Sequence, residues 1–310
     1  MLTPLRVAPV LKERVWGGRR LDPAGVRTIG EAWVVHGANR IVGGPLDGRT
    51  LGEATRELGE RLLGRRGAAG GVRFPLLVKL LDASDWLSVQ VHPDDEQAAR
   101  LESADQLGKT EAWHILEAAP GARVIAGLRP GATREALARA IREGTLLELA
   151  QYLEVRPGDT VFNQAGLVHA LGPGLLLYEV QQSSDITYRV WDWNRPASPE
   201  RPLHVERSLR VVCPEAQPEV TPASAADDGA PLTSCRYFAL ERVGPGPAAL
   251  APAQQSFHAV TVVEGVAVVQ GDGWREELGR FESAVVPAEA DVYRIAGRDG
   301  AYRALVARVP

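Results

Sequence analysis

Gln90 and His92 stand two residues apart in the stretch LSVQVHPDD, at the end of an otherwise apolar run. Because side chains two apart on an extended chain point to the same face, both would project into one space. Burying two polar side chains is unfavourable unless hydrogen bonds or a metal ion satisfy them. The stretch therefore predicts either a buried hydrogen-bond network or a metal site.

Two later strand-like runs offer further groups for the same site. In GKTEAWHIL, alternation places Lys109 and Glu111 on one face and His114 on the other. In GDTVFNQAGLVHALGPG, two glycine turns enclose a strand, and His169 follows the second turn. Two imidazoles and a carboxylate make an open zinc site, to which Gln90 would add a neutral oxygen ligand. Each residue alone is more often an ordinary buried polar group, whereas the four together favour a metal.

A second polar stretch, LYEVQQSSDITYRVWDWNR, carries a carboxylate and a guanidinium on neighbouring strand-like runs. Glu179 and Arg189 would both reach the mouth of a barrel from these strands, where they could serve acid–base and anion chemistry. The alternative is an ordinary surface salt bridge, and the spacing alone leaves both interpretations open.

Short strand-like runs bounded by Gly, Pro, Asn or Asp dominate the first two thirds of the chain, which is typical of a β-sandwich or barrel. They are EAWVVHG, PLLVKLL, WLSVQVH, EAWHILEA, ARVIAGL, GDTVFNQ, LLLYEVQQ and TYRVWDW. Three- and four-residue apolar spacing predicts helices over 51–63 and 132–153, with Thr133 as N-cap and Gly144 dividing the second segment.

The composition changes after about Pro199. Residues 211–231 are rich in Pro, Ala and acidic side chains, which predicts a linker or long loop. Strand-like runs then resume with SCRYFALERV, SFHAVTVVEGVAVVQ, ESAVVPA and YRALVARV. We expect a first domain over 1–210 with a helical insertion at 132–153, and a smaller jelly-roll-like domain over 232–310. That second domain contains only His258 as a metal-type side chain and is expected to be structural, without metal ligands.

The bulk composition describes a turn-rich chain of 310 residues with a net charge of −4. This balance gives no reason to expect nucleic acid or an anionic membrane as a partner. The two cysteines, Cys213 and Cys235, form no CxxC pattern and are expected to be reduced thiols. No signal-type apolar region opens the sequence, and no apolar run approaches the roughly 20 residues that span a bilayer. We therefore expect a cytoplasmic protein.

Taken in order, the motifs resemble the type I phosphomannose isomerases, or mannose-6-phosphate isomerases, of the short bacterial branch. SVQVHPDD, LGKTEAWHIL, GD…GLVHALGPG and EVQQSSDITYRVWDWNR carry the resemblance, and KERVWGG, GEAWVV and FPLLVKLLDA extend it over about residues 5 to 210. Two stretches depart from the family pattern: Asn163-Gln164, where an apolar residue and Pro are expected, and VVHGAN after GEAW.

The resemblance implies a mainly β protein with a cupin (jelly-roll β-barrel) catalytic domain and a smaller C-terminal cupin-like domain. It implies interconversion of D-mannose 6-phosphate and D-fructose 6-phosphate through an enediolate, with one Zn²⁺ per chain. Carried over by motif, Arg189 and Lys109 would bind the phosphate or the developing oxyanion, and Trp16 would line the sugar pocket. Glu179 would transfer the proton, with Lys109 and a metal-bound hydroxide as alternatives. The implied metal ligands are Gln90, His92, Glu111 and His169.

Two other classes remain open at this point. A cupin dioxygenase with iron or nickel usually surrounds its metal with several histidines. The glutamine at position 90 therefore argues against this class. A non-catalytic zinc cupin that binds sugar or sugar phosphate is the stronger alternative, because a fold alone does not fix function. The presence of Lys109, Glu179 and Arg189 beside a complete ligand set favours the enzyme. We expect a small-molecule sugar phosphate as the partner, whereas the sequence is compatible with a monomer or a dimer.

Overall fold

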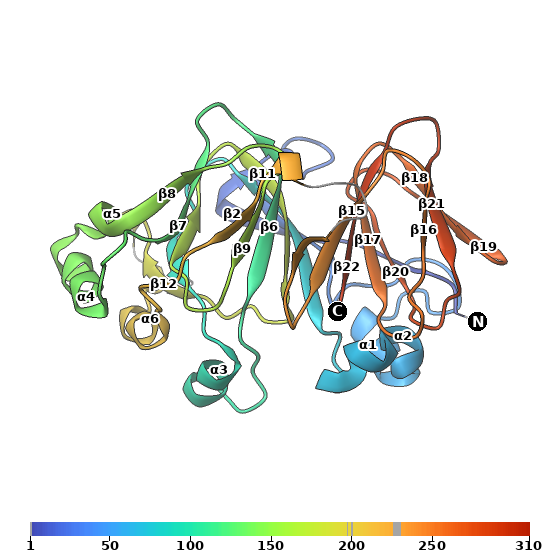
Figure 1. Ribbon diagram of the computed structural model, residues 1–310, viewed down its shortest axis with the longest axis horizontal. Coiled ribbons are helices and arrows are strands. Elements are labelled where there is room, and N and C mark those ends of the chain that lie inside the picture. The colour runs from blue at the N-terminus through green and yellow to red at the C-terminus, as the bar shows by residue number, and fades with distance from the viewer. Residues whose placement is uncertain (1, 197, 200, 226–230) are drawn as a thin grey trace. The chain divides into compact units, whose positions relative to one another are not determined.

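The computed structural model describes residues 2–196, 198–199, 201–225 and 231–310, and most of its regular structure is β-strand (Figure 1). The strands form four sheets, and the chain divides into two compact units. The site unit comprises Glu13–Glu31 and Leu81–Ala223. The companion unit comprises Met1–Lys12, Ala32–Leu80 and Ser224–Pro310. The prediction of a mainly β protein is confirmed.

Two sheets build the site unit. The five-stranded sheet has the order β12 (Tyr188–Trp191), β5 (Val89–Val91), β10 (His169–Leu171), β7 (Arg123–Leu128) and β8 (Ala150–Glu154). The seven-stranded sheet has the order β13 (Glu219–Thr221), β9 (Thr160–Asn163), β6 (Glu111–Ala118), β11 (Leu175–Gln182), β4 (Leu76–Ala83), β2 (Val10–Gly18) and β3 (Ile29–Val35).

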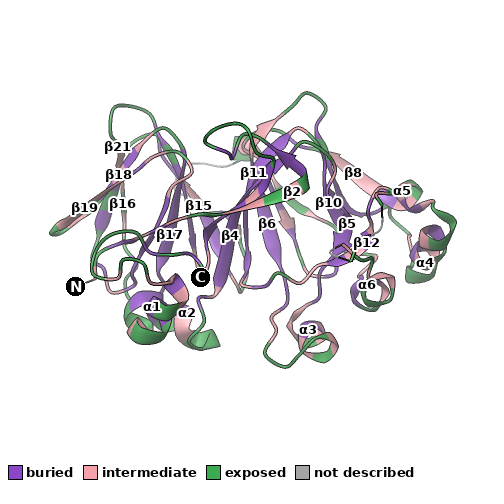
Figure 2. Cartoon of the chain, turned by 180° about the vertical axis from the view of Figure 1, so that it is seen from behind, coloured by how far each residue is buried: buried purple, intermediate pink, exposed green. Residues whose placement is uncertain are grey.

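The apolar core of the site unit lies between these two sheets. Val124 and Leu171 of the five-stranded sheet share one buried cluster with Trp113 and Leu177 of the seven-stranded sheet. Strands β4 and β11 are buried along their whole length (Figure 2). The seven-stranded sheet has one additional pairing, between β3 and β4, but among the described residues neither sheet pairs its first strand with its last, so the predicted jelly roll is a sandwich of open sheets rather than a closed barrel.

The two predicted helical segments fold differently from the prediction. The segment at 51–63 is broken at Gly59 (φ 52°) into α1 (Leu51–Leu58) and α2 (Glu60–Gly67). The segment at 132–153 contains α4 (Arg134–Glu143) and α5 (Leu146–Leu149), with the Thr133 cap and the Gly144 division confirmed. Its last residues are not helical, because they form β8 and pair with β7. Helical periodicity within the segment carries no information about this partner strand.

The predicted linker at 211–231 is partly structured. Its positions 226–230 lie outside the described residues. Helix α6 (Val205–Val211) ends where the predicted linker begins, and β13 then pairs with β9, so that Val220 lies opposite Val161. The stretch before residue 226 therefore extends the seven-stranded sheet instead of forming only a loop.

The companion unit is a second sandwich with its own apolar core. Its six-stranded sheet has the order β1 (Leu5–Val7), β20 (Ser283–Val286), β17 (His258–Glu264), β22 (Arg303–Arg308), β15 (Ala239–Val243) and β14 (Pro231–Ser234). Its four-stranded sheet has the order β16 (Ala248–Leu250), β21 (Tyr293–Gly297), β18 (Ala267–Gly271) and β19 (Trp274–Leu278).

The compact units interleave along the chain, whereas the sequence predicts consecutive domains over 1–210 and 232–310. Leu5 of β1 lies opposite Val285 of β20, so the first strand extends the sheet of the companion unit. Helix α2 also belongs to this unit, because the Arg66 N–H donates to the Gln255 carbonyl at 2.9 Å. Composition along the chain cannot reveal such long-range pairing.

Gly166 connects the fold to the candidate site, and its replacement gives a first prediction. Its φ of +86° is unfavourable for side-chain-bearing residues, its N–H donates to the His92 carbonyl at 2.9 Å, and an added Cβ would lie 3.0 Å from Cys213 Cβ. Gly131 has a similar φ of +83° but nothing within 4 Å of an added Cβ. We expect Gly166→Ala to lower the free energy of unfolding by about 2–4 kcal/mol, because strain and overpacking add. We expect Gly131→Ala to lower it by about 1–2 kcal/mol.

Urea unfolding of the two variants measures this difference. Equal losses of stability would show that the space around Gly166 does not constrain the loop before His169.

Candidate metal centre and active site

Three neighbouring strands of the five-stranded sheet place polar side chains at one level. Arg189 of β12 lies opposite Gln90 of β5, and Gln90 lies opposite His169 of β10. Residues directly opposite each other in antiparallel strands project from the same face. The row Arg189–Gln90–His169 therefore comes from strands far apart in the sequence.

The seven-stranded sheet contains two rows of side chains that lie opposite each other on neighbouring strands. Glu111 of β6 lies between Asn163 of β9 and Gln181 of β11. Two residues further along the strands, Trp113 lies opposite Glu179. Because alternate residues share a face, both rows project from the face on which Trp113 contributes to the core between the sheets.

His92, Glu111 and His169 bring their ligand atoms together. All three side chains are at most 1% exposed, and the atoms lie within 4.8 Å of one another. His92 Nε2 lies 3.1 Å from His169 Nε2 and 3.6 Å from Glu111 Oε2, and His169 Nε2 lies 3.3 Å from Glu111 Oε1. Ligands bound at about 2.0–2.1 Å to a tetrahedral zinc ion are about 3.3 Å apart. The donor separations therefore fit one small divalent cation.

The chemistry of His169 also fits a metal ligand. Its Nδ1 lies 2.9 Å from the Leu167 carbonyl, which can only accept a hydrogen bond, so the ring proton is on Nδ1 and the Nε2 lone pair faces the cluster. Burial, together with the positive charge of Lys109, lowers the pKa of His169 to about 4. The imidazole is thus neutral near pH 7, as a metal ligand must be.

Lys109 and Gln90 complete the immediate surroundings. Lys109 Nζ lies 3.0 Å from Glu111 Oε2 and is 3% exposed as a residue. The Gln90 amide lies 3.3 Å from His169 Nε2. The oxygen and nitrogen of a side-chain amide are assigned from the surrounding hydrogen bonds, so either atom can occupy the position nearest the cluster. With a cation bound, the Gln90 oxygen would face the cluster. The structure brings together all four residues predicted as ligands, while the ligand role itself stays a prediction.

Glu179 is buried beside this cluster, so the alternative of a surface salt bridge is wrong for this residue. It is 3% exposed, and its Oε2 accepts a hydrogen bond from Trp113 Nε1 at 2.8 Å. Its negative charge acts on His169, where it partly offsets the lowering of the histidine pKa. Trp113 also packs its ring edge-on against His169, with 5.4 Å between ring centroids.

Arg189 lies half-buried at the end of the Gln90 row. Its Nε donates to Ser88 Oγ at 3.2 Å and its Nη1 donates to the Pro202 carbonyl at 2.9 Å. Burial and the positive charge of Arg201 lower the pKa of Arg189 from its ordinary value. In the described part of the chain Nη2 makes no hydrogen bond, so this end of the guanidinium can bind an anion.

Three further residues, Trp16, Ser88 and His114, lie in or near the site unit's core. Trp16 is 4% exposed and belongs to the same apolar cluster as Trp113, so its role in lining a sugar pocket stays a prediction. Ser88, which orients Arg189, was not singled out, although its position two residues before Gln90 predicts a shared face. His114 lies on the opposite face from Glu111, as predicted, and is hydrogen-bonded to Thr160 Oγ1 at 2.9 Å.

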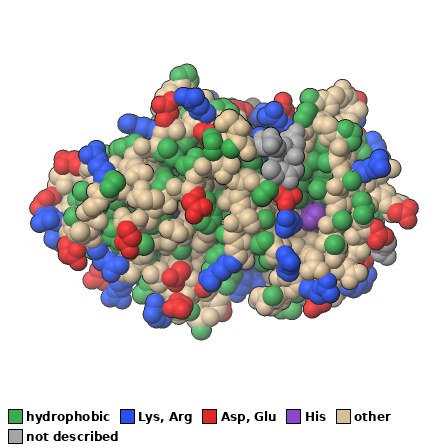
Figure 3. Space-filling view, in the orientation of Figure 1, with side chains coloured by type: hydrophobic (Ala, Val, Ile, Leu, Met, Phe, Trp, Pro, Cys, Tyr) green, Lys and Arg blue, Asp and Glu red, His purple; other side chains and the backbone are tan. Residues whose placement is uncertain are grey.

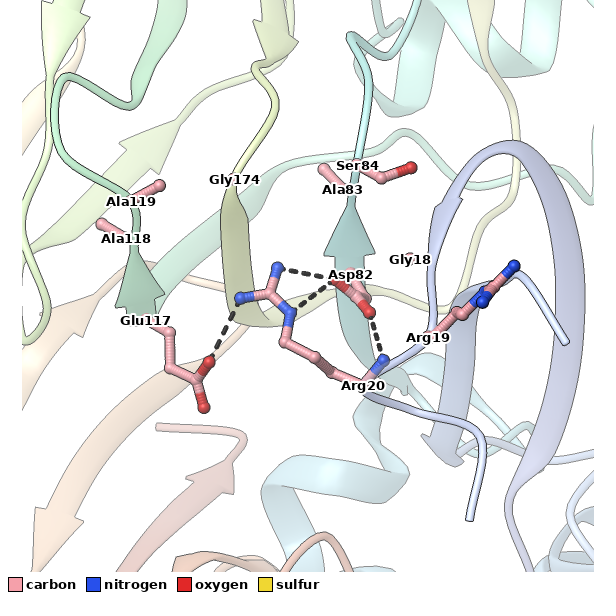
Figure 4. Close-up of a pocket in the computed structure, with 10 residues that line it drawn as sticks. All are labelled: Gly18, Arg19, Arg20, Asp82, Ala83, Ser84, Glu117, Ala118, Ala119 and Gly174. Atoms are coloured by element: carbon pink, nitrogen blue, oxygen red, sulfur yellow. Dashed lines mark hydrogen bonds and ion pairs between the residues drawn. The ribbon is translucent and has the colours of Figure 1, made fainter. Parts of the chain in front are cut away.

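A pocket of about 520 Å³ lies at the other end of β6 and β11 (Figure 4). Its lining residue Glu117 is six positions along β6 from Glu111, or roughly 20 Å in an extended strand. Arg20 crosses the pocket to bind Asp82 and Glu117. A Cβ added at Gly18 would lie 2.3 Å from the Asp82 carboxylate, so a larger residue there would displace the carboxylate that Arg20 binds. This pocket is a structural junction of charged side chains, separate from the metal-ligand cluster.

On the face shown in Figure 3, acidic and basic side chains are interspersed. Among the described residues, no helix has both the length and the apolar character needed to span a membrane.

Facing β-sheets with a buried His–Glu–His cluster define a protein of the cupin class with a candidate metal centre. The family model for "Phosphomannose isomerase type I, catalytic domain" matches residues 5–117. The chain belongs to this family of isomerases. It is 35% identical over 312 residues to the probable mannose-6-phosphate isomerase GmuF of Bacillus subtilis, covering 96% of this chain and 97% of that protein. It is 37% identical to a mannose-6-phosphate isomerase of Streptococcus mutans, over 72% of each chain.

Solved structures agree with this assignment. The mannose 6-phosphate isomerase of Bacillus subtilis superposes with a TM-score of 0.86 at 29% identity, covering 99% of each chain. Phosphomannose isomerase variants from Salmonella typhimurium, at 17% identity and a TM-score of 0.76 for one of them, share the fold. The predictions of a cupin fold and of an isomerase are therefore confirmed.

Removing one candidate ligand tests the metal centre. We expect His169→Ala to weaken metal binding by more than about 100-fold, because loss of a ligand exceeds the 10–100-fold effect of losing an outer-shell partner. His114→Ala serves as the matched control, since this buried histidine on β6 points away from the cluster. Metal content after dialysis, determined by mass spectrometry on folded protein, measures the effect. Equal metal content in the two variants would exclude His169 as a ligand.

Proposed function

We propose that this isomerase is zinc-dependent and interconverts D-mannose 6-phosphate and D-fructose 6-phosphate through an enediolate. The observation that carries the proposal is the buried cluster of two imidazoles and a carboxylate, with an amide beside them, in a chain of this family. Relatives such as the mannose-6-phosphate isomerase ManA of Bacillus subtilis are named for this substrate.

The donor set suits zinc. Imidazole nitrogen and carboxylate oxygen are common zinc ligands, and three protein ligands leave a position open at a catalytic site. His92, Glu111 and His169 would hold the ion, and the Gln90 amide oxygen would be a fourth, weaker ligand. When bound, zinc supplies a Lewis acid that polarises oxygen atoms of the substrate.

Charge balance supports a phosphorylated substrate. Glu111, Glu179 and Lys109 are all buried, and their formal charges sum to −1. A divalent ion changes this sum to +1, and Arg189 raises it to +2. A phosphate monoester carries a charge of about −1.5 to −2 near pH 7. The loaded site would therefore be electrostatically complementary to a sugar phosphate.

The chain's own side chains account for the proton transfer. In the open-chain aldose, Glu179 takes the proton from C2, and delivery of a proton to C1 completes the ketose, while a proton also moves from the C2 oxygen to the C1 oxygen. The Trp113 N–H holds one carboxylate oxygen of Glu179 and so orients the base. The positive charge of Lys109 stabilises the enediolate oxygens, and Arg189 binds the phosphate. Lys109 and Glu179 are each 3% exposed, which limits the access of water to these two groups.

A coupled assay with mannose 6-phosphate tests the proposed function. We expect the purified protein to form fructose 6-phosphate, to lose this activity after chelation and to regain it when zinc is added back, because the Lewis acid is required for catalysis. Bound zinc without product formation would contradict the isomerase mechanism and favour a sugar-binding cupin. Activity unaffected by complete metal removal would contradict the metal dependence.

Arg189→Ala tests the anion-binding role. We expect retained zinc but a decrease in kcat/KM of about 10²–10³-fold, because a preorganised cationic group that binds the substrate anion is lost. Arg207→Ala is the control, because Arg207 is largely exposed and pairs with Glu102 on the surface. Its kcat/KM should be unchanged, with less than about 1 kcal/mol of stability lost. A near-normal kcat/KM of Arg189→Ala would exclude the proposed role.

A further inference from the structure

Asn163, the last residue of β9, lies directly opposite Glu111 in the antiparallel pair of β9 and β6. Residues paired in this way have Cβ atoms about 4.5–5.5 Å apart on one face of the sheet. Asn163 is 1% exposed, so its amide projects into the same interior space as the Glu111 carboxylate. The motif that identifies the family does not explain this asparagine, since an apolar residue is expected there.

Neither polar atom of the Asn163 amide has a hydrogen-bond partner in the part of the chain that the structure describes. Other buried amides are anchored. Asn39, 0% exposed, donates to the Ala8 carbonyl at 2.6 Å and to the Trp33 carbonyl at 2.8 Å. Gln181, on the other side of Glu111, donates to the Ser184 and Gln182 carbonyls. An unpartnered buried amide destabilises the fold, so Asn163 requires an explanation other than stability.

We propose that Asn163 binds a hydroxyl group of the sugar phosphate in the isomerase site. An amide offers two donors and one acceptor oxygen, and a hydroxyl group both donates and accepts, so the two groups are complementary. The phosphate is less suitable as the partner, because the neighbouring Glu111 carboxylate repels it and Arg189 offers an available cationic donor. This assignment rests on the proposed function, because it places the sugar beside Glu111.

If Asn163 binds a substrate hydroxyl, it contributes to the substrate specificity of the site. A site built to hydrogen-bond a substrate hydroxyl discriminates strongly against a ligand that lacks it, because the buried polar group is then left without a partner. Since the hydrogen bond would form in both the bound ground state and the transition state, its loss should appear mainly in KM.

Asn163→Leu and Asn39→Leu form a matched pair of buried, similarly sized substitutions. We expect Asn163→Leu to raise KM for mannose 6-phosphate at least about tenfold, with a smaller change in kcat and with zinc content and melting temperature maintained or raised. We expect Asn39→Leu to lower the melting temperature by several degrees, because two backbone carbonyls lose their donors, while KM stays unchanged. Asn163→Ala removes the amide without added volume and should reproduce the rise in KM.

Three results would overturn the proposal. They are an unchanged KM in Asn163→Leu and Asn163→Ala, a fall in stability without a kinetic effect, and a loss of zinc that accounts for the lost activity. A binding measurement that does not depend on turnover distinguishes failure of this inference from failure of the proposed function. This measurement is the shift in melting temperature that mannose 6-phosphate causes. If the wild type is stabilised by the sugar phosphate but does not isomerise it, the function fails, and a smaller shift in Asn163→Leu still supports hydroxyl binding.

Discussion

The site unit holds the candidate ligand atoms of two histidines and a glutamate within a few ångströms of one another in its buried interior. The rest of its structure depends on this constraint. His92 Nε2 and His169 Nε2 are 3.1 Å apart, and the Glu111 carboxylate lies close to both. The lone pairs of two neutral imidazoles repel at this distance unless a proton or a cation lies between them. The sandwich must therefore fix strands from both sheets in register, since a slip of one residue would turn each ligand to the opposite face.

Two of the candidate ligands, His169 and Glu111, are oriented by neighbouring groups with which they make defined contacts. The Leu167 carbonyl fixes the tautomer of His169, Trp113 packs against the same ring and holds Glu179, and Lys109 pairs with Glu111. Partners of this kind orient metal ligands and tune their basicity, and their loss typically lowers metal affinity or activity by about 10–100-fold. The polar interior of the site unit is consequently a connected network, and the two polar atoms of the buried Asn163 amide have no hydrogen-bond partner in the part of the chain that is described.

The companion unit contains a buried histidine whose neighbours differ from those of His169. His258 is 6% exposed, its Nδ1 lies 2.8 Å from the Tyr293 hydroxyl, and burial with nearby Arg308 lowers the pKa of this histidine to about 4. Its low pKa resembles that of His169, but among the described residues His258 belongs to no cluster of three or more His, Cys, Asp or Glu side chains that could hold a metal ion. The difference between the two histidines lies in their neighbours, which the sandwich architecture alone does not determine.

The sequence by itself determined the side-chain types and, through two-residue alternation, the faces on which they lie. Gln90 with His92, and Lys109 with Glu111, were paired correctly, and His114 was placed on the opposite face. Only the tertiary structure decided which strands become neighbours. It set Asn163 beside Glu111 and Arg189 beside Gln90, it made Ala150–Glu154 a strand, and it joined Leu5–Val7 to the companion unit. Periodicity is a local property of the chain, whereas strand pairing depends on closing long loops and packing two sheets face to face.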